Sequence, residues 1–139
     1  MARVIHLETA GKERTQLVRG VVLALRELAQ QQQADLTTKD LAAFIALALE
    51  SIYTTIDSSV AAWEKRGYWV KADRFRLDWD WTRRLGSAMR QAVLEEDWDR
   101  VAQTAAEVAV HFKAEKVPQR HRLGTPWVGA YQRLNQLRS

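Results

Sequence analysis

The chain contains no cysteine among its 139 residues. Disulfide bonds, thiolate metal sites and a cysteine nucleophile are therefore excluded, and the composition fits a reducing compartment. Only two prolines occur, Pro118 and Pro126, and residues 21–66 contain neither proline nor glycine. Because these two residue types disfavour helices most strongly, their absence from so long a stretch favours long helices.

Long apolar runs are also missing. The longest is nine residues, from Leu41 to Leu49, whereas a helix that crosses a bilayer needs about 20 apolar residues. No apolar core of signal-peptide length follows the first residues. We therefore expect a cytoplasmic protein with no membrane partner.

Positive charge is in small excess and is unevenly distributed. The net charge is +4, yet residues 1–116 hold 17 basic and 17 acidic side chains. Residues 117–139 hold no acid and carry the whole excess on Arg120, Arg122, Arg133 and Arg138. We therefore divide the chain into a helical body, residues 1–116, and a basic C-terminal segment, residues 117–139, whose short helix packs on the same domain.

Apolar residues recur at the 3.6-residue period in five segments. The predicted helices are residues 9–33, 38–66, 71–95, 97–116 and 126–137. Thr37, Asp97 and Thr125 are the expected N-cap residues of the second, fourth and fifth helices, and Gly67 is expected to end the second. The residues from Ile52 to Ser59 include several β-branched and hydroxyl side chains, which are mediocre helix formers. The second helix could therefore kink or end early in this segment.

The segment after Gly67 fits two patterns. From Phe75 to Trp81, aromatic and apolar residues alternate with charged ones, which is typical of a strand. The same segment continues a heptad stripe over 22 residues, made of Ala72, Phe75, Trp79, Thr82, Gly86, Met89 and Val93. Because the stripe is three times as long as the alternation, we favour a helix and keep the strand as the alternative. Long helices joined by short turns then predict an all-α fold, a four-helix up-down antiparallel bundle with a short C-terminal helix.

No enzyme signature is present in the sequence. There is no glycine-rich phosphate loop, no dinucleotide fingerprint and no nucleophile elbow, and none of the three histidines follows a glutamate at the spacing of di-iron bundles. Glu107, His111 and Glu115 share one face of the fourth predicted helix, but the pattern is more typical of a solvated helix face than of a metal site. We therefore expect no catalytic residues, no cofactor and no metal.

Aromatic and basic residues are concentrated in residues 63–84. Most of these aromatic side chains are expected to close the end of the bundle, with arginine stems packed against them. Trp81 and Leu77 fall off the heptad face, so with Trp69 they are candidates for an interface. The anionic-ligand or nucleic-acid contacts that the sequence suggests are Arg74, Arg76, Arg120, Arg122, Trp127 and Arg133.

Two fragments resemble parts of a winged-helix protein. The run from Thr37 to Ala42 resembles the start of a helix-turn-helix, and the run from Trp63 to Tyr68 resembles the end of a recognition helix. The resemblance implies that Phe75–Trp81 is the wing. The two fragments lie about one helical turn further apart than the usual spacing, and the apolar run between them has no turn residue.

The sequence thus favours a non-enzymatic module for protein interaction or assembly. Such a module would either associate with itself, as a homodimer, or bind a protein partner. Nucleic-acid binding through the basic tail and the aromatic-basic stretch is the first alternative. A bundle that binds a metal or a small ligand is the second.

Overall fold

The computed structural model describes residues 7–138, and its secondary structure there is entirely helical. The helices are α1 (Leu7–Leu28), α2 (Leu36–Lys65), α3 (Trp69–Leu94), α4 (Trp98–His111) and α5 (Ala130–Gln136). The all-α prediction is confirmed. The prediction of a helix over residues 71–95 is also confirmed, so the strand alternative is wrong. A wing over Phe75–Trp81 is excluded, because that segment lies inside α3.

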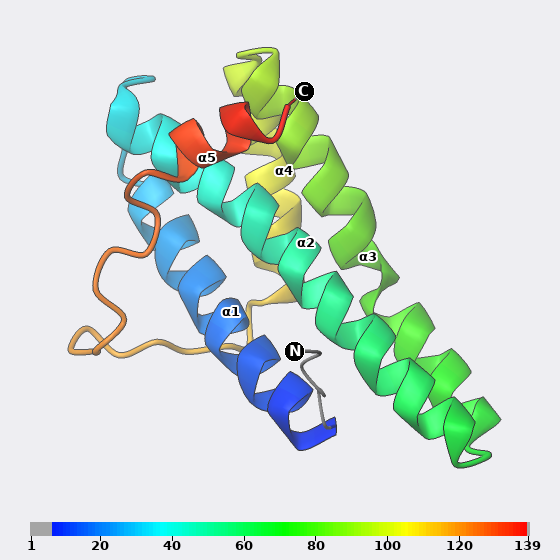
Figure 1. The fold of residues 1–139 in the computed structure, drawn as a ribbon. Coiled ribbons are helices and arrows are strands. Elements are labelled where there is room, and N and C mark those ends of the chain that lie inside the picture. The colour runs from blue at the N-terminus through cyan, green and yellow to red at the C-terminus, as the bar shows by residue number, and fades with distance from the viewer. Residues whose placement is uncertain (1–6, 139) are drawn as a thin grey trace.

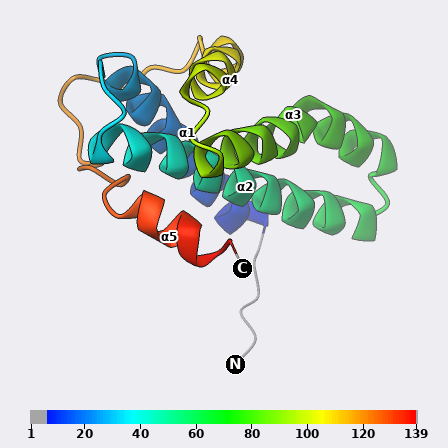
Figure 2. The ribbon, with the colours of Figure 1, turned by 90° about the horizontal axis from the view of Figure 1, so that it is seen from above.

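Helix α2 is the centre of the molecule (Figures 1 and 2). Helices α1 and α3 both pack along α2 and run antiparallel to it, and α5 lies across the N-terminal part of α2. Helix α4 packs mainly on α3 and makes few contacts with α1. Helices α1 and α4 are therefore only loosely packed against each other.

Helix α2 is long and apolar enough, by length and composition alone, to cross a membrane. More than half of its most apolar window, 56%, is buried inside the protein. Fourteen of its residues are buried, among them Leu41, Ile45 and Leu49. Burial of this kind is typical of the core helix of a folded domain.

The close contact between α2 and α3 depends on small side chains. A Cβ atom placed on Gly86 of α3 would lie 3.1 Å from the Cβ of Leu49 and 3.4 Å from the backbone nitrogen of Glu50. Alanines Ala42, Ala43, Ala46 and Ala48 of α2 are buried in the same core. The heptad position that Gly86 occupies in the sequence is therefore a point where two helix backbones approach each other.

Helix α2 runs without a break through the segment where a kink or early end was left open. The hydroxyl of Thr55 donates to the carbonyl of Ile52 at 2.6 Å, and those of Thr54 and Ser58 donate to carbonyls one turn earlier. Arg14 of α1 donates to the Thr55 hydroxyl and carbonyl at 3.1 Å each and to the Ser59 hydroxyl at 2.7 Å. The buried hydroxyls of Thr55 and Ser59 thus have hydrogen-bond partners inside the bundle, so their burial in the helix leaves no polar group unpaired.

The N-cap of α2 is Asp35, not Thr37 as predicted. The Asp35 carboxylate accepts a hydrogen bond from the backbone of Thr38 at 3.0 Å. Helix α1 ends at Leu28, five residues earlier than predicted, because the amide of Gln31 donates to the carbonyl of Leu28 and its side chain to the carbonyl of Glu27. These bonds satisfy the last carbonyls of α1 and close its C-terminus.

Two predicted helix ends are confirmed. Gly67 has a φ of +82° and forms a Schellman motif, in which the amides of Gly67 and Tyr68 donate to the carbonyls of Glu64 and Trp63. Asp97 caps α4 by accepting a hydrogen bond from the Arg100 amide at 3.2 Å.

Helix α5 begins at Ala130, four residues later than predicted, and Thr125 is not its cap. Gly129 is the N-cap residue, with a left-handed φ of +84°. The carboxylate of Asp40, from α2, accepts hydrogen bonds from the amides of Gly129 at 3.2 Å and Tyr131 at 3.0 Å. A side chain from another helix therefore caps α5 and fixes it to α2.

The chain between α4 and α5 is also fixed to the body. Helix α4 ends at His111 rather than near Lys116, because Phe112 and Val117 turn inward and are buried. The guanidinium of Arg26, on α1, donates to the carbonyl of Val117 at 2.8 Å. The C-terminal segment thus crosses the outside of α1 and then α2 (Figure 1).

Candidate interaction surfaces

A largely apolar groove runs between the C-terminal half of α1 and α4, with glutamines and a threonine at one end. One hollow of about 230 Å³ is lined by Leu28, Gln31, Gln32, Gln33, Ala34, Thr38, Trp98, Val101 and Ala102. A second hollow of about 250 Å³ is lined by Leu25, Leu28, Ala29, Ala102, Ala105, Ala106 and Ala109. Because the hollows share Leu28 and Ala102, they form one continuous depression, which we name the α1–α4 groove.

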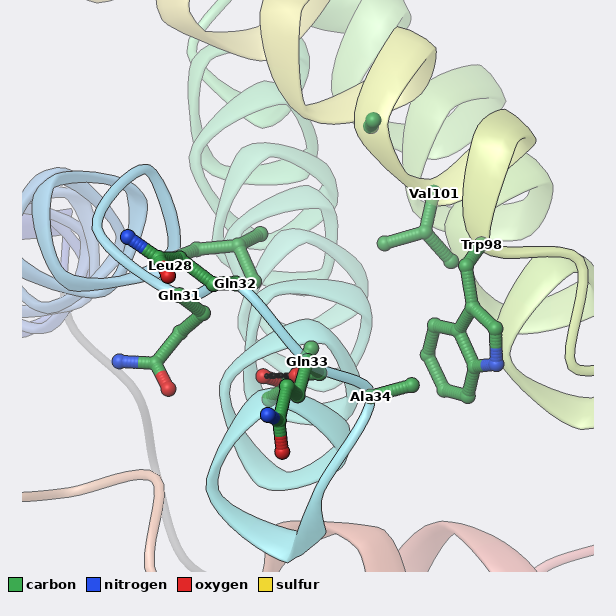
Figure 3. A pocket seen from close by; sticks show the side chains of 9 residues that line it. Leu28, Gln31, Gln32, Gln33, Ala34, Trp98 and Val101 are labelled. Atoms are coloured by element: carbon green, nitrogen blue, oxygen red, sulfur yellow. Dashed lines mark hydrogen bonds between the residues drawn. The ribbon is translucent and has the colours of Figure 1, made fainter.

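The side chains of the groove explain why it is open. In Figure 3, Trp98 and Val101 of α4 lie on one side of the first hollow, and Leu28 and Ala34 lie on the other. Further along, α4 presents only alanines toward α1, and these side chains are too short to fill the space. No titratable side chain of the described residues lines either hollow, so the groove is suited to apolar contact rather than to acid–base or metal chemistry.

The sequence contains a signal for this groove that its interpretation missed. In the fourth predicted helix, the apolar residues that recur at the helical period form a stripe of Trp98, Val101, Ala102, Ala105, Val108, Ala109 and Phe112. The structure buries Val101, Val108 and Phe112 of that stripe but leaves Ala102 and Ala109 exposed. The stripe is therefore wider than the face that α3 covers, and a stripe of that width indicates a second contact surface.

The hairpin of α2 and α3 forms a second candidate surface. Its end projects beyond α1 and α4 (Figures 1 and 2). A small core of Ile56, Val60 and Ala72, with Trp63, Phe75 and Trp79 packed around it, supports this end. At the turn, Tyr68 is 55%, Trp69 60% and Val70 78% exposed. We name residues 65–71 the hairpin apex.

The predicted interface residues have different surroundings. Trp69 and Leu77 are exposed, at 60% and 77%. Trp81 is half-buried, and its ring stacks on His111 at 3.9 Å between centroids and meets the ring of Phe112 edge-on at 5.0 Å. Trp81 is thus largely covered by the end of α4, whereas the other two side chains are available to a partner.

The predicted anionic-ligand contacts do not form one site. Arg74 is exposed beside the hairpin apex, and Arg76 forms ion pairs with Asp73 at 3.2 Å and Glu64 at 3.7 Å. Arg120 and Arg122 lie on the loop before α5, on the opposite side of the molecule from the apex (Figures 1 and 2).

In the C-terminal segment, Trp127 is 8% exposed, so its ring is part of the core rather than a platform for a base. Arg133, on α5, is exposed. The C-terminal segment therefore presents arginines to solvent without the aromatic partner that the sequence suggested.

Glu107, His111 and Glu115 do not share one helix face in the structure. Helix α4 ends at His111, so Glu115 lies outside the helix and the expected spacing is lost. The ring of His111 stacks on that of Trp81. Among residues 7–138 no group of three histidine or acidic side chains could hold a metal ion.

No known family, curated protein or solved structure matches this chain.

Proposed function

We propose that the protein is a non-enzymatic assembly module whose α1–α4 groove binds a second copy of the chain. In this proposal α1 to α4 form an up-down antiparallel four-helix bundle with one open side. The observation that carries the proposal is that open side: α4 barely contacts α1, and the groove between them is apolar and uncharged. A second copy covers this surface and removes it from water.

The chemistry of the groove favours a second copy over an acidic or basic partner. Because its lining is uncharged, two identical faces meet without the repulsion that like charges impose. The alanines of α4, among them Ala106, let two helices approach closely, and a two-fold axis makes each face its own complement. A charged partner would gain nothing from such a lining.

Disulfide trapping tests this interface directly, because the chain has no cysteine of its own. We expect Ala106→Cys, in the groove, to give a disulfide-linked dimer under mild oxidation, seen on a non-reducing gel. Glu107→Cys is the matched control, since Glu107 is exposed on the same helix but lines neither hollow. Equal cross-linking of the two variants, or none in either, would argue against the groove as the interface.

Nucleic-acid binding is supported by a different observation. Arg120, Arg122 and Arg133 are all exposed, and no ion pair of theirs is seen among the described residues. In that case the affinity for a random oligonucleotide falls steeply with salt, and Arg120→Glu with Arg122→Glu weakens it further. We rank this function second, because the apex and the tail lie on opposite sides and Trp127 is buried.

A further inference from the structure

In the hairpin apex, basic side chains flank a short run of apolar ones. Lys65 and Arg66 precede Gly67, then come Tyr68, Trp69 and Val70, and Lys71 follows. Apart from the glycine, every one of these side chains is exposed. We propose that the apex binds the surface of a lipid bilayer that contains anionic lipids, with the three apolar side chains entering the interface and the basic ones contacting the headgroups.

The apolar part of the apex fits the boundary between headgroups and acyl chains. Tryptophan and tyrosine concentrate at that boundary, because each has an apolar ring and one polar atom. Tyr68, Trp69 and Val70 are exposed at the junction of α2 and α3, and this junction is the end of the projecting hairpin (Figure 2).

The apex is rigid before it binds. The Schellman motif at Gly67 fixes the end of α2, and α3 begins at Trp69, only two residues later. The ammonium group of Lys71 lies over the ring of Trp63, 4.6 Å from its centroid. Little conformational entropy is therefore lost when the apex meets a surface, which favours binding.

The charges around the apex add up to a positive field. Lys65, Arg66, Lys71 and Arg74 are exposed. The neighbouring acids Glu64 and Asp73 both pair with Arg76, which offsets only one of their two charges, and Asp78 lies near Lys71 and Arg74. With Arg76 counted, five basic side chains face three acidic ones, so the region keeps a net charge of +2. Anionic lipids attract such a cluster within about a Debye length of the membrane. Two copies of the apex would repel each other, which makes self-association through this end unfavourable.

A membrane suits the shape of the apex better than a folded partner does. The apex is the end of a projecting hairpin, and a fluid surface moulds around it without a matching cavity (Figure 2). The sequence-based expectation of no membrane partner rested on the lack of a spanning segment, which does not bear on surface attachment. The apex and the α1–α4 groove use different residues, so the inference does not depend on the proposed function.

Vesicle flotation tests the proposal. The full chain is mixed with vesicles of phosphatidylcholine alone, or with about 30% phosphatidylserine, at about 0.1 M salt. We expect flotation only with the anionic vesicles. Trp69→Ser with Val70→Ser, and separately Lys71→Glu with Arg74→Glu, should each lower the bound fraction at least about tenfold. All four positions are exposed, and circular dichroism verifies that each variant is folded.

The matched control is Arg120→Glu with Arg122→Glu, which changes the net charge equally on the opposite side of the molecule. We expect this variant to float like the unchanged chain, within about twofold. The proposal is overturned if the chain does not float with anionic vesicles, or if the control loses as much binding as the apex variants. It is also overturned if binding survives the loss of Trp69 and Val70, or if the apex binds single-stranded DNA but not vesicles.

Discussion

Replacing Gly86 with leucine is expected to lower the free energy of unfolding by about 3 kcal/mol. Even the first carbon of the new side chain would lie 3.1 Å from the Cβ of Leu49 and 3.4 Å from the backbone nitrogen of Glu50. The second of these atoms belongs to the backbone of α2 and cannot rotate away. Helices α2 and α3 must therefore separate, which loosens the largest helix–helix contact of the molecule.

Gly11→Leu is the matched control for this prediction. Gly11 also lies inside a helix, α1, but a Cβ atom there would have no neighbour within 4 Å. Leucine at that position should raise the free energy of unfolding by about 0.5–1 kcal/mol, because glycine is a poor helix former. Urea unfolding followed by circular dichroism measures both variants. A Gly86→Leu protein as stable as the unchanged chain would contradict the close packing of α2 on α3.

Asp40→Ala is expected to cost about 2–4 kcal/mol and to release the C-terminal segment. Asp40 is 6% exposed, and its carboxylate accepts hydrogen bonds from the amides of Gly129 and Tyr131. Alanine leaves both amides without their partner and removes the negative charge from the N-terminus of α5. Limited proteolysis should then cut the segment between α4 and α5, residues 118–128, under conditions that leave the unchanged chain intact.

Two further variants show whether the loss of stability and the faster cleavage come from loss of the α5 cap. Asp40→Asn keeps one carbonyl oxygen as an acceptor, so we expect an intermediate loss of stability. Asp35→Ala removes the ordinary N-cap of α2 and should cost about 1 kcal/mol without faster cleavage near α5. If Asp40→Ala changed neither the unfolding midpoint nor the cleavage rate, the carboxylate would not be what fixes α5.

The sequence predicts the five helices well because their signals are local. Apolar residues at the helical period and the turn at Gly67 depend only on near neighbours in the chain. The predicted end of α4 and the predicted start of α5 were wrong because the residues that fix them have distant partners. Asp40 is 89 residues from Gly129, and Arg26 is 91 residues from Val117. No pattern in the sequence pairs such residues.

The candidate surfaces were predicted in part for a similar reason. The aromatic-basic stretch was visible in the sequence, and Trp69 and Leu77 are indeed exposed. Trp81 could not be assigned, because its neighbours His111 and Phe112 come from another helix. The α1–α4 groove was missed because the sequence does not show which part of the wide apolar stripe on α4 is covered by α3 and which part, with Ala102 and Ala109, is left exposed.

Sedimentation equilibrium of the unchanged chain is the most direct test of self-association through the α1–α4 groove. The proposal predicts a species of twice the 16.0 kDa chain mass at micromolar concentration and a return to the single-chain mass for Ala106→Arg, which places a charge in the groove. A mass of 16.0 kDa for the unchanged chain at every concentration, or a dimer that Ala106→Arg leaves intact, would contradict it.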